Sequence, residues 1–151
     1  MSVDPDTFDQ QVRAYIYDTV LTQGTIPIIA EVAAELGSTP SEVTAAFRRL
    51  AQGHVLVLQP ENHEILMANP YSAVPTPFQV EAGGRSYWGN CVWDALGVLA
   101  MLRQDGQVVA GCGDCHETMT LSVHDGQIVN SPGIAHFSVP AKQWWDNIVF
   151  T

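Results

Sequence analysis

Residues 87–102 read YWGNCVWDALGVLAML, and the rest of the chain is organised around this stretch. Its apolar residues from position 92 recur at spacings of three and four, which predicts a helix. Asn90 is the expected N-cap, because its side-chain oxygen can accept a hydrogen bond from an unpaired amide of the first turn. Cys91 then falls in the first turn, where the helix dipole favours the thiolate over the thiol.

Asp94 follows Cys91 by three residues, so the thiol and the carboxyl share one face of the predicted helix. Trp88 and Trp93 flank the pair, and by keeping water away they would raise the pKa of the carboxyl. This pattern predicts a nucleophilic thiolate beside an acid that keeps its proton. The structural alternative is a small buried cysteine and an acidic residue that merely suits the helix dipole.

Composition limits the classes of function. The 151 residues are enough for one domain or for two small modules that share a core. The hydrophobic fraction is 46%, yet no run is long enough to span a membrane, and the acidic start does not resemble a signal peptide. A net charge of −10 argues against nucleic-acid or anionic-membrane partners, and three cysteines cannot all pair. We therefore expect a cytoplasmic protein.

The first 68 residues have the order of a winged helix-turn-helix. Helices are expected over 8–21, 28–36 and from a cap at Ser38 or Thr39 to Gly53, followed by strands over 55–58 and 64–67. Arg48 and Arg49 are the only cations of the third helix, too few for groove binding in an acidic module. The winged-helix shape is therefore expected to serve packing or dimerisation.

The predicted fold class is α+β, with a three-helix winged-helix-like module followed by a mixed β-sheet domain around a central helix. The module covers 1–68, a proline-rich connector 69–80 and the sheet domain 81–151, with strands expected over 78–82, 106–110, 117–123, 127–129, 134–139 and 144–151.

A second cysteine motif, Cys112-Gly113-Asp114-Cys115, precedes His116 at a bend between two expected strands. The spacing fits half of a zinc site, and Cys91 with His116, His124 or His136 would have to supply the other half. A thioredoxin-like redox motif is less well supported, because such motifs begin a helix.

Taken together, these features resemble the alkylmercury lyases. The likeness rests on the winged-helix front, Ala73-Val74-Pro75-Thr76, Tyr87-Trp88-x-x-Cys91-x-x-Asp94, the Cys112 turn and the strand at 148–150, and so runs over nearly the whole chain. It implies a mixed sheet packed against the helices, protonolysis of carbon–mercury bonds, and no cofactor.

Carried over by position, the resemblance implies that Cys91 is the first thiolate on mercury and that Asp94 protonates the departing carbon. Cys112 would be a structural cysteine. Mercury(II) is soft and prefers thiolates, and charge donated by sulfur makes the attached carbon easier to protonate. The implied partners are a small organomercurial or Hg(II), together with small thiols.

The family's second catalytic thiolate would follow the strand matched at 148–150, and so lie beyond Thr151. We therefore expect either a shortened sequence or a protein without that thiol, in which Cys115 is the candidate second metal ligand. The alternatives are a non-enzymatic thiol-based mercury binder or sensor and, third, a winged-helix transcriptional regulator. The sequence predicts neither the oligomeric state nor the preferred organic group.

Overall fold

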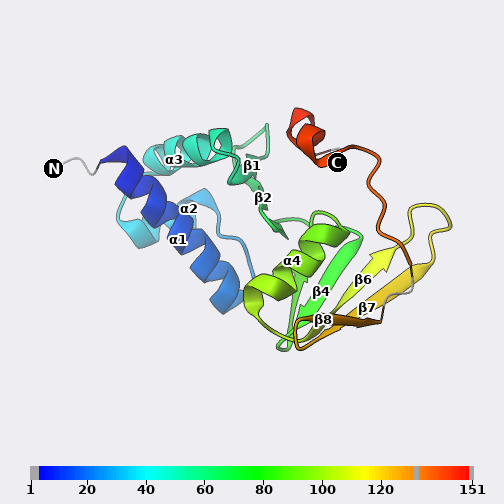
Figure 1. Ribbon diagram of the computed structural model, residues 1–151. Coiled ribbons are helices and arrows are strands. Elements are labelled where there is room, and N and C mark those ends of the chain that lie inside the picture. The colour runs from blue at the N-terminus through cyan, green and yellow to red at the C-terminus, as the bar shows by residue number, and fades with distance from the viewer. Residues whose placement is uncertain (1–3, 131–132, 150–151) are drawn as a thin grey trace.

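The computed structural model describes residues 4–130 and 133–149. It is an α+β structure whose helices α1 to α3 and strands β1 to β3 form one part, and whose five-stranded sheet and helix α4 form the other (Figure 1). Among the described residues, no helix combines the length and apolar character needed to cross a membrane.

The first part contains three helices and a small antiparallel sheet of order β1-β2-β3. Their bounds are α1 Pro5–Gln23, α2 Ile29–Leu36, α3 Pro40–Gln52, β1 Leu56–Leu58, β2 Ile65–Ala68 and β3 Tyr71–Ser72. The expected capping box of α3 is confirmed, since the Thr39 side chain and Glu42 each accept from the other's backbone nitrogen. Helix α1 starts three residues earlier than expected because Asp4 accepts from the Thr7 nitrogen.

The second part is a sheet of order β5-β4-β6-β7-β8, and all four of its strand pairs are antiparallel. The expectation of a mixed sheet was therefore wrong. The strands are β4 Phe78–Ala82, β5 Arg85–Trp88, β6 Gly106–Gly111, β7 Thr118–His124 and β8 Gln127–Asn130, and helix α4 spans Val92–Leu102. Hairpin connections explain three of these pairs, β4 with β5, β6 with β7 and β7 with β8, since short turns such as Gly83-Gly84 and Asp125-Gly126 reverse the chain directly.

Helix α4 packs on strands β4 and β6, and its position depends on Gly89. A Cβ atom at Gly89 would lie 2.6 Å from the backbone nitrogen of Ala95, inside the first turns of α4. Only glycine lets the chain leaving β5 pass this close to the helix, so Gly89 fixes where α4 begins relative to the sheet.

Two hydrophobic cores lie in the two parts. The first is centred on Val12, Ile16, Val32, Val43, Phe47 and Leu56, and the second on Val20, Tyr71, Val80, Val98 and Val108. Helix α1 contributes to both, because Val20 belongs to the second core and Tyr17 packs against each. The domain boundary expected at residues 69–80 stays a prediction. Helix α1 nevertheless packs in the cores of both parts.

The C-terminal segment differs from the sequence prediction. Residues 134–139 form no strand, Ala141–Asp146 form the 3-10 helix η1, and 147–149 form a turn rather than a strand. The expected strand at 144–151 was therefore wrong over 144–149, while 150–151 lie outside the described residues. A segment with an alternating pattern forms a strand only where a neighbouring strand is available for pairing. In this segment the Trp144 indole nitrogen instead donates to the Val139 carbonyl, 2.8 Å away.

Candidate active site

A cavity of about 220 Å³ opens beside the N-terminus of α4. Three regions far apart in the sequence surround it: the end of β2, the start of α4, and the C-terminal segment, which crosses back above α4 towards α3 and β1 (Figure 1). The lining residues are Met67, Asn69, Asn90, Cys91, Trp93, Asp94, Phe137, Trp144, Trp145, Ile148 and Val149.

Cys91 is the N-cap of α4, a role that the sequence assigned to Asn90. The Cys91 backbone is extended, with φ −147°, and its Sγ accepts a hydrogen bond from the Asp94 nitrogen at 3.5 Å. The helix thus begins one residue later than expected. The thiol lies at the positive end of the helix dipole and also lines the cavity.

The ionisation of Cys91 runs against the sequence expectation of a thiolate. Burial raises the pKa of the thiol, and the backbone nitrogen of Asp94 only partly offsets this effect. The Asp94 carboxylate adds to the rise, both by its negative charge and by accepting a hydrogen bond from the thiol. In the unliganded protein the proton therefore belongs to the sulfur.

Asp94 follows the sequence expectation more closely. Burial raises the pKa of its carboxyl, while hydrogen bonds to the Asn90 and Cys91 side chains lower it. The carboxyl and the thiol thus share one hydrogen bond in a partly desolvated cavity. A proton can pass between sulfur and oxygen without crossing bulk water.

Asn90 ties the start of α4 to the strand layer of the first part. Its Nδ2 donates to Asn69 Oδ1 at 3.3 Å and to the Pro70 carbonyl at 3.2 Å. Its buried Oδ1 has no hydrogen-bond partner among the residues that the structure describes. This side chain lines the cavity, so an acceptor is available there for a donor group.

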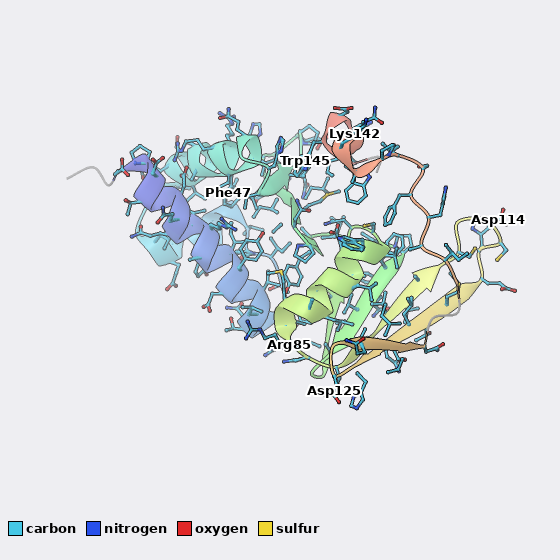
Figure 2. All side chains as sticks on the ribbon, in the orientation of Figure 1. Phe47, Arg85, Asp114, Asp125, Lys142 and Trp145 are labelled. Carbon is cyan, nitrogen blue, oxygen red and sulfur yellow. The ribbon has the colours of Figure 1, made fainter. Side chains whose placement is uncertain are left out.

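The apolar wall of the cavity comes mainly from the C-terminal segment, which the sequence analysis did not connect with the site. Phe137 and Trp144 pack with ring centroids 5.3 Å apart, and Trp145 stacks on His54 at 4.0 Å with an interplanar angle of 6°. His54 follows α3, so this stack fastens the segment to the first part of the chain (Figure 2). The sequence signal available for this wall was the adjacent pair Trp144 and Trp145, which lies in a segment expected to be a strand.

The two tryptophans expected around the pair have different positions. Trp93 lines the cavity but is 64% exposed, so it shields the carboxyl only in part. Trp88 lies on β5, opposite Gln79, and is not among the residues that line the cavity. Met67, which the sequence analysis did not single out, contributes a thioether to the lining.

Cys112 and Cys115 lie outside the cavity, in the β6–β7 hairpin. Hydrogen bonds from the backbone of Cys115 and Asp114 and from the Cys115 side chain lower the pKa of Cys112. The convergence of Cys91 and a histidine with these cysteines, which a zinc site would require, is not found among the described residues, where the one three-ligand cluster is Asp105, His124 and Asp125. Cys115 is likewise not placed beside the candidate nucleophile.

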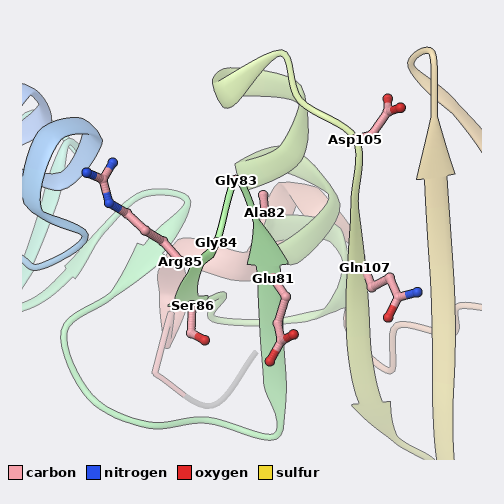
Figure 3. Close-up of a pocket in the computed structure, with 8 residues that line it drawn as sticks. All are labelled: Glu81, Ala82, Gly83, Gly84, Arg85, Ser86, Asp105 and Gln107. Carbon is pink, nitrogen blue, oxygen red and sulfur yellow. The ribbon is translucent and has the colours of Figure 1, made fainter.

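A larger concavity, of about 380 Å³, surrounds the β4–β5 turn (Figure 3). Its lining includes Glu81, Arg85 and Asp105, and Figure 3 shows the Arg85 side chain directed away from Asp105. Its lining contains no thiol, so the cavity at α4 remains the candidate active site.

Comparisons with known proteins identify the family to which the chain belongs. Residues 71–151, more than half of the chain, match the family model described as alkylmercury lyase. The solved structure of the mercury-bound form of MerB2 is similar with a TM-score of 0.61 and 19% identity, over 85% of this chain and 67% of that one. At this identity the likeness concerns the fold. No curated protein matches the sequence.

Proposed function

Because the chain belongs to the alkylmercury lyase family, we propose that it cleaves carbon–mercury bonds by protonolysis in the cavity at the N-terminus of α4. One observation carries this proposal: Cys91 and Asp94 line the same cavity at the start of α4, where the Asp94 backbone nitrogen donates to the Cys91 sulfur and the Asp94 carboxylate helps to raise the pKa of the thiol. A soft ligand for mercury and a proton donor for carbon are thus adjacent.

In the first step the Cys91 sulfur displaces a ligand X⁻ from an organomercurial R–Hg–X. A sulfur–mercury bond forms, the mercury–X bond breaks, and the thiol proton passes to the Asp94 carboxylate along their hydrogen bond. Burial favours the neutral carboxyl, so Asp94 can hold this proton inside the cavity. The raised pKa of Cys91 is compatible with this step because the base stands next to the thiol.

In the second step Asp94 gives the proton to the carbon bound to mercury. The carbon–mercury bond breaks, R–H is released, and Hg(II) remains on Cys91 beside a regenerated carboxylate. A second soft ligand would come from a small thiol in solution, since Cys112 and Cys115 do not line the cavity and Met67 offers only a thioether.

The organic group R would lie against the C-terminal segment. Phe137, Trp144, Ile148 and Val149 give this wall an apolar surface, whereas Asn69, Asn90 and Asp94 form the polar side of the cavity. With this division the carbon would lie against the apolar wall and the mercury near the Cys91 sulfur. Apolar organic groups are therefore the expected substrates.

We assign the front of the chain a winged-helix-like shape used for packing. Both cations of α3 are engaged within the protein: Arg49 binds Asp9 through two hydrogen bonds of 2.8 and 2.6 Å, and Arg48 lies 3.0 Å from His63 Nε2. This does not favour groove binding. Three free thiols suit a reducing, cytoplasmic compartment.

The decisive experiment compares Asp94→Asn with Cys91→Ser in the presence of a small thiol. Asp94→Asn keeps the sulfur and the cavity shape, so it should bind an organomercurial and release almost no R–H, because an amide supplies no acidic proton. Cys91→Ser should lose the cleavage and the binding in the cavity, while any mercurial that it still binds should lie on Cys112 or Cys115. Equal loss of binding and cleavage in Asp94→Asn would contradict the role of proton donor.

The same experiment tests the non-enzymatic alternative, which is favoured by the single thiol in the cavity lining. A mercury-binding or sensing relative would bind the organomercurial through Cys91 and release no R–H at any thiol concentration. Thiol-dependent release of R–H by the unmodified chain, at more than one turnover, would exclude that alternative.

A further inference from the structure

The β6–β7 hairpin carries a pair of thiols that the proposed chemistry does not use. Cys112 follows the end of β6 directly, and Cys115 is exposed at the tip of the hairpin, next to the labelled Asp114 (Figure 2). Figure 2 shows Asp114, at this hairpin, well separated in the view from Lys142 and Trp145 of the C-terminal helix η1. The two thiols therefore lie apart from Cys91 and outside the cavity.

The turn has a geometry that places both sulfurs together. The His116 nitrogen donates to the Cys112 carbonyl at 3.1 Å, which closes one helical turn over residues 112–116, and the Cys112 nitrogen donates to the Glu117 carbonyl at 2.8 Å. Residues three apart on such a turn are neighbours. The effect of the Cys115 side chain, which helps to lower the pKa of Cys112, agrees with this placement.

The surroundings of the pair limit which ions it can take. No third histidine, cysteine or carboxylate converges on the two sulfurs within the described part of the chain, although Asp114, His116 and Glu117 are close in sequence. A structural zinc ion requires four ligands, so this turn suits it poorly. A soft cation that two thiolates can fully coordinate, such as Hg(II), finds its complete set of ligands in these two sulfurs.

We propose that Cys112 and Cys115 form a two-thiolate binding site for soft, two-coordinate cations, with Hg(II) as the representative ligand. Binding forms two sulfur–mercury bonds and breaks two S–H bonds together with the two bonds from mercury to its previous ligands, such as chloride or monothiolate, and the protons and these ligands pass to the solvent. No electron transfer is involved. A Cβ atom at Gly113 would meet nothing within 4 Å, so the turn leaves space around it. The proposal is independent of carbon–mercury cleavage.

The test uses the full chain carrying Cys91→Ser, reduced and handled without oxygen, with mercuric chloride as the probe. Native mass spectrometry in the presence of excess monothiol should show one retained Hg(II), and sulfur-to-mercury charge transfer should appear in the ultraviolet spectrum. Adding Cys112→Ser or Cys115→Ser should weaken retention roughly 100-fold, because each variant loses the chelate.

Two controls make the result specific. Asp114→Asn changes the same turn but keeps both thiols, so it should retain mercury as the Cys91→Ser parent does. Zinc should be lost to the monothiol under conditions where mercury stays. Retention that survives Cys115→Ser, or zinc binding of comparable strength, would overturn the two-thiolate site; circular dichroism of each variant checks that the fold is kept.

Discussion

The Cys91 sulfur and the Asp94 backbone nitrogen lie 3.5 Å apart, so the atom that caps helix α4 is also the candidate ligand for mercury. When mercury binds this sulfur, the first turn of the helix and the metal compete for its electron pairs. Stability and chemistry are therefore linked at one residue, and substitutions can separate them.

Replacing Cys91 by serine or by alanine should give different stabilities. Serine is a strong N-cap, so Cys91→Ser should unfold at the same denaturant concentration as the parent or a higher one, whereas Cys91→Ala should lose about 0.5–2 kcal/mol. Both should fail to bind mercury in the cavity. Equal stability of the two variants by urea unfolding would mean that the cap contributes nothing.

Cysteine labelling should follow thiolate content rather than the sequence expectation. The pKa of Cys112 is lowered and that of Cys91 is raised, so a polar alkylating reagent at neutral pH should modify Cys112 well before Cys91. In a chain that carries Cys112→Ser and Cys115→Ser, an apolar organomercurial supplied at one equivalent should protect Cys91. Mass mapping of the native protein checks both, and early alkylation of Cys91 would contradict the structure.

The Trp145–His54 stack should matter more for large substrates than for small ones. Trp145→Ala removes the stack and part of the cavity wall, while His54→Ala removes the stack alone. Because such an aromatic contact contributes about 0.5–1.5 kcal/mol, KM for an organomercurial with a bulky apolar group should rise roughly twofold to tenfold in either variant. Lys142→Ala, on η1 but outside the lining, is the matched control (Figure 2).

Tyr71 should make the protein sensitive to alkali. Burial, followed by the nearby Tyr87 and Tyr17, raises the pKa of Tyr71 from 10.0 to about 12, so the folded state holds the neutral phenol when the unfolded state has begun to ionise. Stability is present in full below pH 10 and declines up to about pH 12, by at most roughly 2–3 kcal/mol.

Tyr71→Phe supplies the control for that decline. The Tyr71 hydroxyl is buried and has no hydrogen-bond partner among the described residues, so its removal should cost little at neutral pH. Between pH 10 and 12 the variant should unfold at a higher denaturant concentration than the parent. A decline of the same size in both proteins would assign the alkaline sensitivity to other groups.

The local signals in the sequence predicted most of the fold. Thr39 and Glu42 form the expected capping box. The apolar spacing after Asn90 predicted the start of helix α4 to within two residues. These features depend on neighbours in sequence. The antiparallel order of the sheet depends on distant pairings, such as Val80 with Val108, which a residue pattern does not specify.

The candidate site could be predicted only in part, for the same reason. Cys91 and Asp94 are local neighbours, and the sequence brings them together on one helix end. The wall contributed by Phe137, Trp144 and Trp145 comes from a segment whose alternation resembled a strand. The direction in which the pKa of Cys91 shifts could not be predicted from the sequence either. It depends on burial in the folded protein, which outweighs the effect of the helix dipole.

Helix α1 runs through both cores as one continuous element, with Val12 and Ile16 in the first and Val20 in the second. A hinge motion that separated the two parts would therefore have to break or bend this helix. Of the elements that line the cavity, the C-terminal segment is therefore the one that could shift without bending α1, and the Trp145–His54 stack would have to separate for it to do so.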